Sequence, residues 1–285
     1  PSVLMMFYRA PGELESELAE MDECMPHYYK ITGSHGQGAE TIMHAEAAFM
    51  QGRFTDAHIA LERAYAQIEG NGQENMALCC DFLARRLSLF TDIGQRAKLE
   101  KRRERLLAHH NVSWLNLWNA AAAYHHALLG STDSIPEAYR RHRLFTVRTL
   151  APGKPMIEMI ENQVYLAQGE YAHVIGRSEG LLTQCEAMHY ALVALHIRIQ
   201  TAAAYEMLGK HGEARALLER ALADAEPDGF ALPFAENFRY LEPLLTERLQ
   251  DGLTGHIVRL GGLAGQRRAA AERPAVLAAL TEREC

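Results

Sequence analysis

The sequence predicts an all-α fold built of stacked antiparallel helix pairs, and three observations carry that prediction. The 285 residues include 43 Ala but only 8 Val and 12 Ile. Alanine is the best helix former, whereas β-branched residues favour strands. No proline occurs over residues 27–135 or 156–226, and long proline-free stretches suit successive helices. The third observation is a repeat.

Glycines punctuate the chain at a near-constant interval. Gly52, Gly130, Gly169 and Gly209 each follow an apolar-periodic segment and precede another, and Asp92 fills the remaining gap. The steps between them are 40, 38, 39 and 40 residues. A period of about 40 residues indicates one helical hairpin per repeat, with each hairpin stacked on the next.

The repeats share a pattern as well as a spacing. Ala45, Ala123 and Ala202 each lie seven residues before a glycine, where a small side chain lets two helices approach closely. After the glycine, apolar residues recur at steps of three and four, as expected for a buried helix stripe. The clearest case reads Gly52-x-Phe54-x2-Ala57-x3-Leu61-x2-Ala64. The pattern resembles the tetratricopeptide repeat and implies a right-handed superhelix. An irregular helical bundle with coincidental spacing is the alternative.

The periodicity predicts twelve helices and then a change of character. The expected helices cover residues 11–28, 38–51, 54–69, 72–91, 94–108, 111–129, 134–149, 153–168, 170–185, 188–208, 210–226 and 231–249. Five glycines then fall within residues 252–265, which predicts a loosening of the chain. We therefore expect a helical repeat domain over residues 1–250 and a linker over residues 251–285.

Two further stretches go beyond a generic helical array. Residues 280–285 read LTEREC and resemble the opening of the LuxR-type helix-turn-helix domain. Residues 228–236, DGFALPFAE, and residues 1–12, PSVLMMFYRAPG, are similar to the two ends of the helical region in large ATP-dependent LuxR-type activators. This resemblance implies a signal-sensing region lying between an ATPase and a C-terminal DNA-binding domain, both absent from this chain.

The resemblance also implies partners. The effector would be a small-molecule inducer or a regulatory protein, and DNA would be bound only through the absent C-terminal domain. The alternative is a constitutive protein-binding scaffold with no small-molecule ligand. A helical enzyme is a third hypothesis, which ranks below the sensor and the scaffold.

Candidate binding residues follow from the repeat register. The first helix of each hairpin lines the concave face of a superhelix, and the position six before each glycine should face that groove. Polar or aromatic side chains there suit ligand or peptide capture; the rival interpretation is a solvated groove without a ligand. The candidates are Glu46, Tyr124, Gln163 and, from other positions near Gly209, His196 and Glu206.

The sequence lacks the patterns that usually carry catalysis or metal binding. The sequence has no P-loop, no HExxH motif and no nucleophile elbow, so we expect no enzymatic activity, no metal and no cofactor in this fragment. The net charge of −7 argues against a general polyanion binder, although residues 96–105 hold six basic side chains. Five cysteines without CxxC spacing, and no apolar stretch of 18 residues, predict a cytoplasmic protein with reduced thiols and no membrane span.

Overall fold

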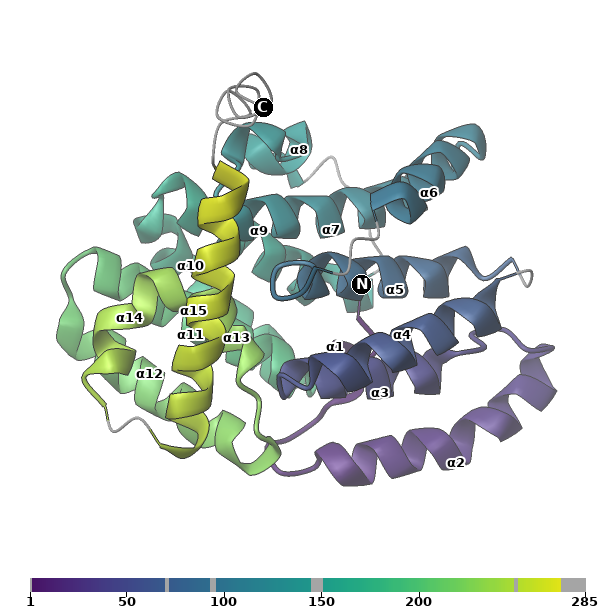
Figure 1. The fold of residues 1–285 in the computed structure, drawn as a ribbon, viewed down its shortest axis with the longest axis horizontal. Coiled ribbons are helices and arrows are strands. Elements are labelled where there is room, and N and C mark those ends of the chain that lie inside the picture. The colour runs from purple at the N-terminus through teal and green to yellow at the C-terminus, as the bar shows by residue number, and fades with distance from the viewer. Residues whose placement is uncertain (1, 70–71, 93–95, 145–150, 249–250, 273–285) are drawn as a thin grey trace, which may run out of the picture.

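The computed structural model describes residues 2–69, 72–92, 96–144, 151–248 and 251–272, and all regular structure within them is helical (Figure 1). The helices are α1 (Leu4–Phe7), α2 (Leu14–Thr32), α3 (Ala39–Met50), α4 (Phe54–Ile68), α5 (Glu74–Leu87), α6 (Arg96–Ala108), α7 (Val112–Leu129), α8 (Glu137–Arg140), α9 (Lys154–Gln168), α10 (Tyr171–Ala187), α11 (Ala191–Met207), α12 (His211–Ala225), α13 (Leu232–Glu236), α14 (Phe238–Thr246) and α15 (Gly252–Glu272).

The all-α prediction is confirmed over the described residues, and among the twelve expected helices the one over residues 134–149 deviates most. Only α8 forms there, beginning after Pro136 and ending before His142, whose φ of 51° lies in the left-handed region. Residues 145–150 lie outside the described residues. The helix expected over 231–249 is divided into α13 and α14 at Asn237. The short helix α1 had no counterpart in the sequence prediction.

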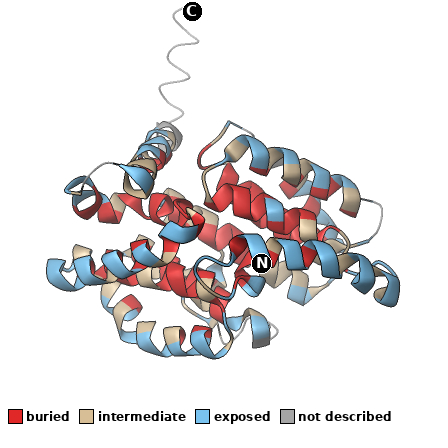
Figure 2. Cartoon of the chain, turned by 90° about the horizontal axis from the view of Figure 1, so that it is seen from below, coloured by how far each residue is buried: buried red, intermediate tan, exposed pale blue. Residues whose placement is uncertain are grey.

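The helices form an inner row and an outer row. In the inner row, α3, α5, α7, α9 and α11 contact one another in sequence, while α4, α10 and α12 pack outside them. The burial pattern follows this division: twelve residues of α11 are buried, against three of the equally long α10. Figure 2 shows the buried residues gathered on the central helices and the exposed residues on the peripheral ones.

Glycine ends the inner helices where the chain must reverse. Gly130 and Gly169 end α7 and α9 in the left-handed conformation, with φ of 79° in both cases. A side chain would be strained at this φ, whereas glycine is not. The small residues placed before the turns, Ala45, Ala123 and Ala202, are completely buried. The glycine positions therefore mark helix ends, as the sequence indicated.

The row of inner helices is closed by elements from the end of the chain. Helix α13 contacts both α3, at the start of the row, and α11, at its end. Helix α15 then packs against α13 and α14.

The expectation of a linker from residue 251 onward is wrong for residues 252–272, which form α15. Ile257, Leu260 and Ala264 lie three and four residues apart and are each at most 5% exposed, so α15 has a buried apolar stripe. One of the glycines that suggested a loose chain instead permits close packing, since Gly261 lies against the ring of Phe238. Residues 273–285 lie outside the described residues.

Candidate functional site

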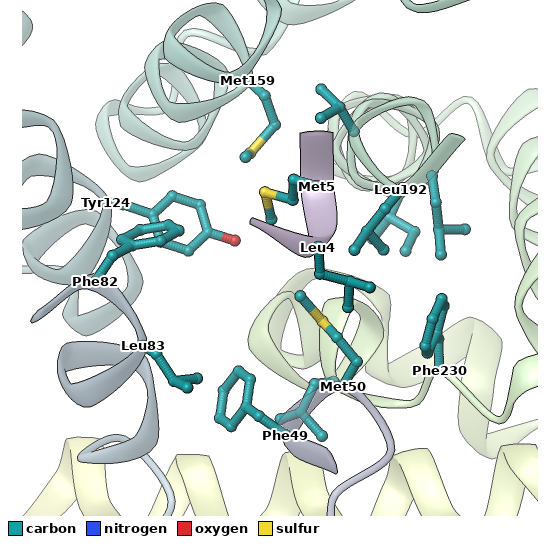
Figure 3. Close-up of a cluster of buried hydrophobic side chains, with 14 of the residues drawn as sticks. Leu4, Met5, Phe49, Met50, Phe82, Leu83, Tyr124, Met159, Leu192 and Phe230 are labelled. Atoms are coloured by element: carbon teal, nitrogen blue, oxygen red, sulfur yellow. The ribbon is translucent and has the colours of Figure 1, made fainter. Parts of the chain in front are cut away.

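The inner helices surround a part of their own chain. Leu4 and Met5 of α1 are 0% exposed, and α1 contacts α3 and α11. Figure 3 shows both side chains at the centre of a ring of apolar and aromatic groups from α3, α5, α7, α9, α11 and the segment before α13. We call the space that Leu4 and Met5 fill the central chamber; its walls are Phe49, Met50, Phe82, Tyr124, Met159, Leu192 and Phe230.

Residues 2–8, the N-terminal segment, are held in the chamber by a few polar contacts. The backbone N–H of Leu4 donates to Glu46 Oε2 at 2.7 Å. The carbonyl oxygen of Tyr8 accepts a hydrogen bond from the Ala191 N–H at 3.2 Å. The Tyr8 hydroxyl donates to Asp228, which also accepts from the N–H groups of Gly12 and Leu14. The segment is thus bound by its backbone, as a peptide ligand would be.

Glu46 is a carboxyl group at the edge of the chamber with 2% exposure. Burial raises its pKa to about 7, and this effect is partly offset by the Leu4 N–H, the Ser2 hydroxyl and the positive charge of Arg86. Desolvation disfavours the charged form of a carboxyl group. Glu46 therefore changes its charge near neutral pH.

A buried ion pair lies beside the chamber. The Arg86 guanidinium donates to both carboxylate oxygens of Glu236, Nε to Oε1 at 2.7 Å and Nη2 to Oε2 at 3.0 Å. The Tyr124 hydroxyl donates to Glu236 Oε2 at 2.9 Å. The guanidinium also lies over the rings of Phe49, Phe82 and Tyr124. This fork geometry orients Tyr124 and joins α5, α7 and α13.

His196 on α11 is a buried polar side chain without hydrogen-bond partners in the described structure. It is 0% exposed, and neither ring nitrogen has a hydrogen-bond partner within the described residues. Its ring centre is 6.5 Å from that of Tyr124. Burial, together with the positive charge of Arg86, lowers its pKa well below the ordinary value, so the imidazole is neutral. A buried polar group without a partner is costly, which is why His196 is a candidate ligand contact.

A chain of side-chain amides connects α9, α11 and the turn after α13. Gln200 on α11 donates to Gln163 Oε1 on α9 at 3.0 Å, and Gln163 donates to Asn237 Oδ1 at 3.0 Å. All three are 0% exposed. Gln163 therefore holds α9, α11 and the turn after α13 in register.

The structure brings four of the five predicted site residues to the interior. Glu46, Tyr124, Gln163 and His196 are each at most 2% exposed. These four side chains are buried, not exposed on an open groove as expected: Glu46 contacts α1, and Tyr124 lies beside Met5 (Figure 3). Ligand binding by these residues stays a prediction.

Glu206 is apart from the other four. Its carboxylate lies 2.8 Å from Nδ1 of His211, at the turn between α11 and α12. It is ten residues beyond His196, or about 15 Å along the helix axis. Glu206 therefore does not join the chamber in this conformation.

Several residues in or beside the chamber were not among the predicted site residues, although the repeat register points to one of them, Arg86. Arg86 lies six residues before Asp92, the same register that selected Glu46 and Tyr124. Glu236 follows the last repeat, so repeat spacing carried no information about it. Leu4 and Met5 belong to a short apolar run that any core would accept.

Other features noted in the sequence have structural roles away from the chamber. Within residues 96–105, Arg102 pairs with Asp81 and Glu74, and Lys98 pairs with Glu62. Trp118 packs under the Arg85 guanidinium, 4.6 Å from the ring centre. Over the described residues, no group of three metal-ligating side chains and no helix long and apolar enough to cross a membrane is present.

Comparison with known proteins adds no family. No protein-family model matches the chain, and no curated protein matches it either. The chamber combines aromatic and methionine walls with a few oriented polar groups, a composition typical of sites that bind small molecules or peptides.

Proposed function

We propose that the chain is the signal-sensing domain of a LuxR-type transcriptional regulator, and that its helix pairs form a tetratricopeptide-like right-handed superhelix. The alternation of inner and outer helices supports the superhelix, as do left-handed glycines at four of the five repeat positions, Gly52, Gly130, Gly169 and Gly209. The inner helices would present the binding site, and the outer helices would present the surface to solvent.

The observation that carries the binding role is the occupied chamber. The interior already holds a peptide, residues 2–8, through apolar side chains and backbone hydrogen bonds. Beside it, the buried His196 keeps two ring nitrogens without partners in the described structure. A scaffold that served only to pack helices would gain stability from an apolar residue at this position.

Sensing would work by differential binding. An effector, either a small-molecule inducer or a regulatory protein, stabilises the state of the domain that it fits better, and this shifts the equilibrium of the full-length regulator. The DNA-binding role belongs to the C-terminal domain implied by the resemblance of residues 280–285, which lie outside the described residues. The five cysteines without CxxC spacing favour a cytoplasmic protein, and the lack of catalytic motifs favours a region without catalytic activity of its own.

Thermal unfolding with a defined compound panel tests the sensor. We expect one member of a panel of sugars, amino acids, nucleotides and short peptides to stabilise the chain by about 2.7 kcal/mol at one hundred times its Kd. This corresponds to a rise in Tm of about 5–10 °C for a domain of this size. His196→Leu should abolish the rise. His125→Leu is the matched control, because His125 is also a helical histidine whose pKa burial lowers, to about 3, and it is not a wall of the chamber.

The constitutive scaffold predicts the opposite result. Its supporting observation is apolar surface, since Phe7 and Tyr28 are 46% and 43% exposed around one cavity. A scaffold without a small-molecule ligand would show no rise in Tm with any compound of the panel. An equal rise in wild type and His196→Leu would contradict the assignment of the chamber as the binding site.

A further inference from the structure

We propose that residues 2–8 are a displaceable internal inhibitor of the central chamber, and that the effector they exclude is an apolar peptide segment of a partner protein. This proposal rests on the proposed function, because it takes the chamber to be the binding site. Residues 2–8, which now occupy the chamber, are themselves a peptide, and for this reason we expect the competing effector to be a peptide as well.

The segment has the features of a bound ligand rather than of a repeat. Helix α1 has only four residues, too few to be stable without its surroundings. Its inner face, Leu4 and Met5, is 0% exposed, whereas its outer residues Met6 and Phe7 are 39% and 46% exposed. The segment therefore has one face made for the chamber and one face left open.

An exit route adjoins the outer face of α1. A cavity of about 440 Å³ lies between α1, α2, α3 and α5, with Met6, Phe7, Met21, Met25 and Met76 in its walls. Methionine side chains adapt readily to a changed shape. Helix α2, on the far side of this cavity, has only Leu14, Glu17 and Met21 buried. The segment can leave through this side while the inner row of helices keeps its contacts.

The groups that release would expose are suited to a peptide. Glu46 would lose the Leu4 N–H and become free to accept a backbone N–H from another chain. The Ala191 N–H would lose the Tyr8 carbonyl oxygen and become free to donate. The apolar walls would take two adjacent apolar side chains in place of Leu4 and Met5. Because burial raises the pKa of Glu46, a hydrogen-bond donor from an incoming peptide would stabilise its ionised carboxylate.

Competition of this kind reduces the apparent affinity. If only a fraction of the molecules has the chamber empty, the apparent Kd exceeds the intrinsic Kd by the inverse of that fraction. Burying one Leu or Met side chain is worth a factor of about ten or more. Weakening the inner face of α1 should therefore tighten binding of a competing peptide by at least about tenfold.

The test compares two double variants of the full chain. The probe is a fluorophore-labelled peptide PSVLMMFYRA, the sequence of residues 1–10, and binding is read by fluorescence anisotropy. We expect Leu4→Asp with Met5→Asp to bind it at least about tenfold more tightly than wild type. The matched control is Met6→Asp with Phe7→Asp, which carries the same charges on the exposed face and should bind like wild type. Equal affinities in all three chains, or no binding by any of them, would overturn the proposal.

A second measurement uses the wild-type chain and needs no folded variant. Hydrogen exchange should show the N–H groups of Leu4 and Ala191 opening at least about tenfold more often than those in the middle of α11, since only the former depend on the segment. Equal protection would mean that α1 leaves only on global unfolding, and the proposal would fall. Failure of Leu4→Asp with Met5→Asp to fold would leave this exchange measurement to decide.

The two proposals can fail separately. A compound from the panel that stabilises wild type and Leu4→Asp with Met5→Asp equally would support the sensor and contradict the inhibitor. Tight binding of the peptide probe by that variant, with no stabilisation by any small molecule, would support the inhibitor and the peptide effector and contradict a small-molecule inducer.

Discussion

Glu46 and Arg86 illustrate how single residues acquire their properties from the interior. Glu46 accepts one N–H from α1, and its pKa lies near neutrality because the carboxyl group is buried. Arg86 is equally buried, but it is paired through two hydrogen bonds and lies over three aromatic rings. The difference between the two residues is the number of compensating contacts, which decides the cost of a buried charge.

The pKa of Glu46 leads to a prediction about pH. The pKa is about 7 in the folded chain against 4.5 for an exposed glutamate, so the folded state binds the proton more tightly than the unfolded state. The contribution of Glu46 to the free energy of unfolding is therefore largest below pH 4.5 and falls by about 3 kcal/mol as the pH rises to 7. Glu46→Gln should lack this fall.

Urea unfolding at several pH values would measure it. We expect the stability of Glu46→Gln relative to wild type to increase between pH 4.5 and 7. Glu15→Gln, at an exposed position of α2, is the control and should follow wild type. A difference between Glu46→Gln and wild type that does not vary with pH would show that the pKa of Glu46 is the same in the folded and unfolded chain.

At the scale of elements, close approach of helices depends on small residues. Helix α15 crosses α13 and α14, and its Gly261 faces the ring of Phe238. A methyl group at Gly261 would lie 2.2 Å from Cγ and 2.6 Å from Cβ of Phe238. Because Cβ is tied to the backbone, relief would require the two helices to move apart. The glycine pair at 261–262 thus has two different roles, one on each face of the helix.

Two alanine substitutions separate these roles. Gly261→Ala should lower the free energy of unfolding by about 1–3 kcal/mol through overpacking. Gly262→Ala should be neutral or stabilising by up to about 1 kcal/mol, because alanine favours the helix and its methyl group meets no atom within 4 Å in the described part of the chain. Urea unfolding of both variants provides the measurement. Equal effects would mean that α15 does not pack on α14 as described.

At the scale of the whole molecule, distant segments close the row of helices. Arg86 and Glu236 are 150 residues apart, Gln163 and Asn237 are 74 apart, and Tyr8 and Asp228 are 220 apart. In an open array of repeats each unit contacts only its neighbours, so stability is local. Here the last elements contact the first, and the described helices should therefore unfold together.

Removing one closing contact tests this. Glu236→Ala leaves Arg86 buried and unpaired, and we expect a loss of about 3–5 kcal/mol. Far-UV circular dichroism and tryptophan fluorescence should shift to lower urea concentration together. Glu247→Ala, which breaks an exposed ion pair with Arg215, is the control and should cost no more than about 1 kcal/mol. Two separate transitions in wild type would contradict cooperative closure.

Most of the helices and the turns between them follow from local sequence patterns. Proline-free, alanine-rich segments with apolar residues three and four apart bury one face whatever they pack against, and glycine is favoured where a helix ends with positive φ, although His142 and His189 also adopt it. These are interactions between near neighbours in the chain. They placed Ala57, Leu61 and Ala64 in the core, all 0% exposed, and they placed Gly130 and Gly169 at helix ends.

Only the tertiary structure decided what fills and closes the interior. That Leu4 and Met5 lie inside the row of helices, that α15 packs where a linker was expected, and that Arg86 meets Glu236 all depend on residues far apart in the sequence. A periodic pattern states that a face is buried, but it does not state which segment covers it. That choice is made by shape and by the pairing of buried polar groups, and both exist only once the helices are assembled.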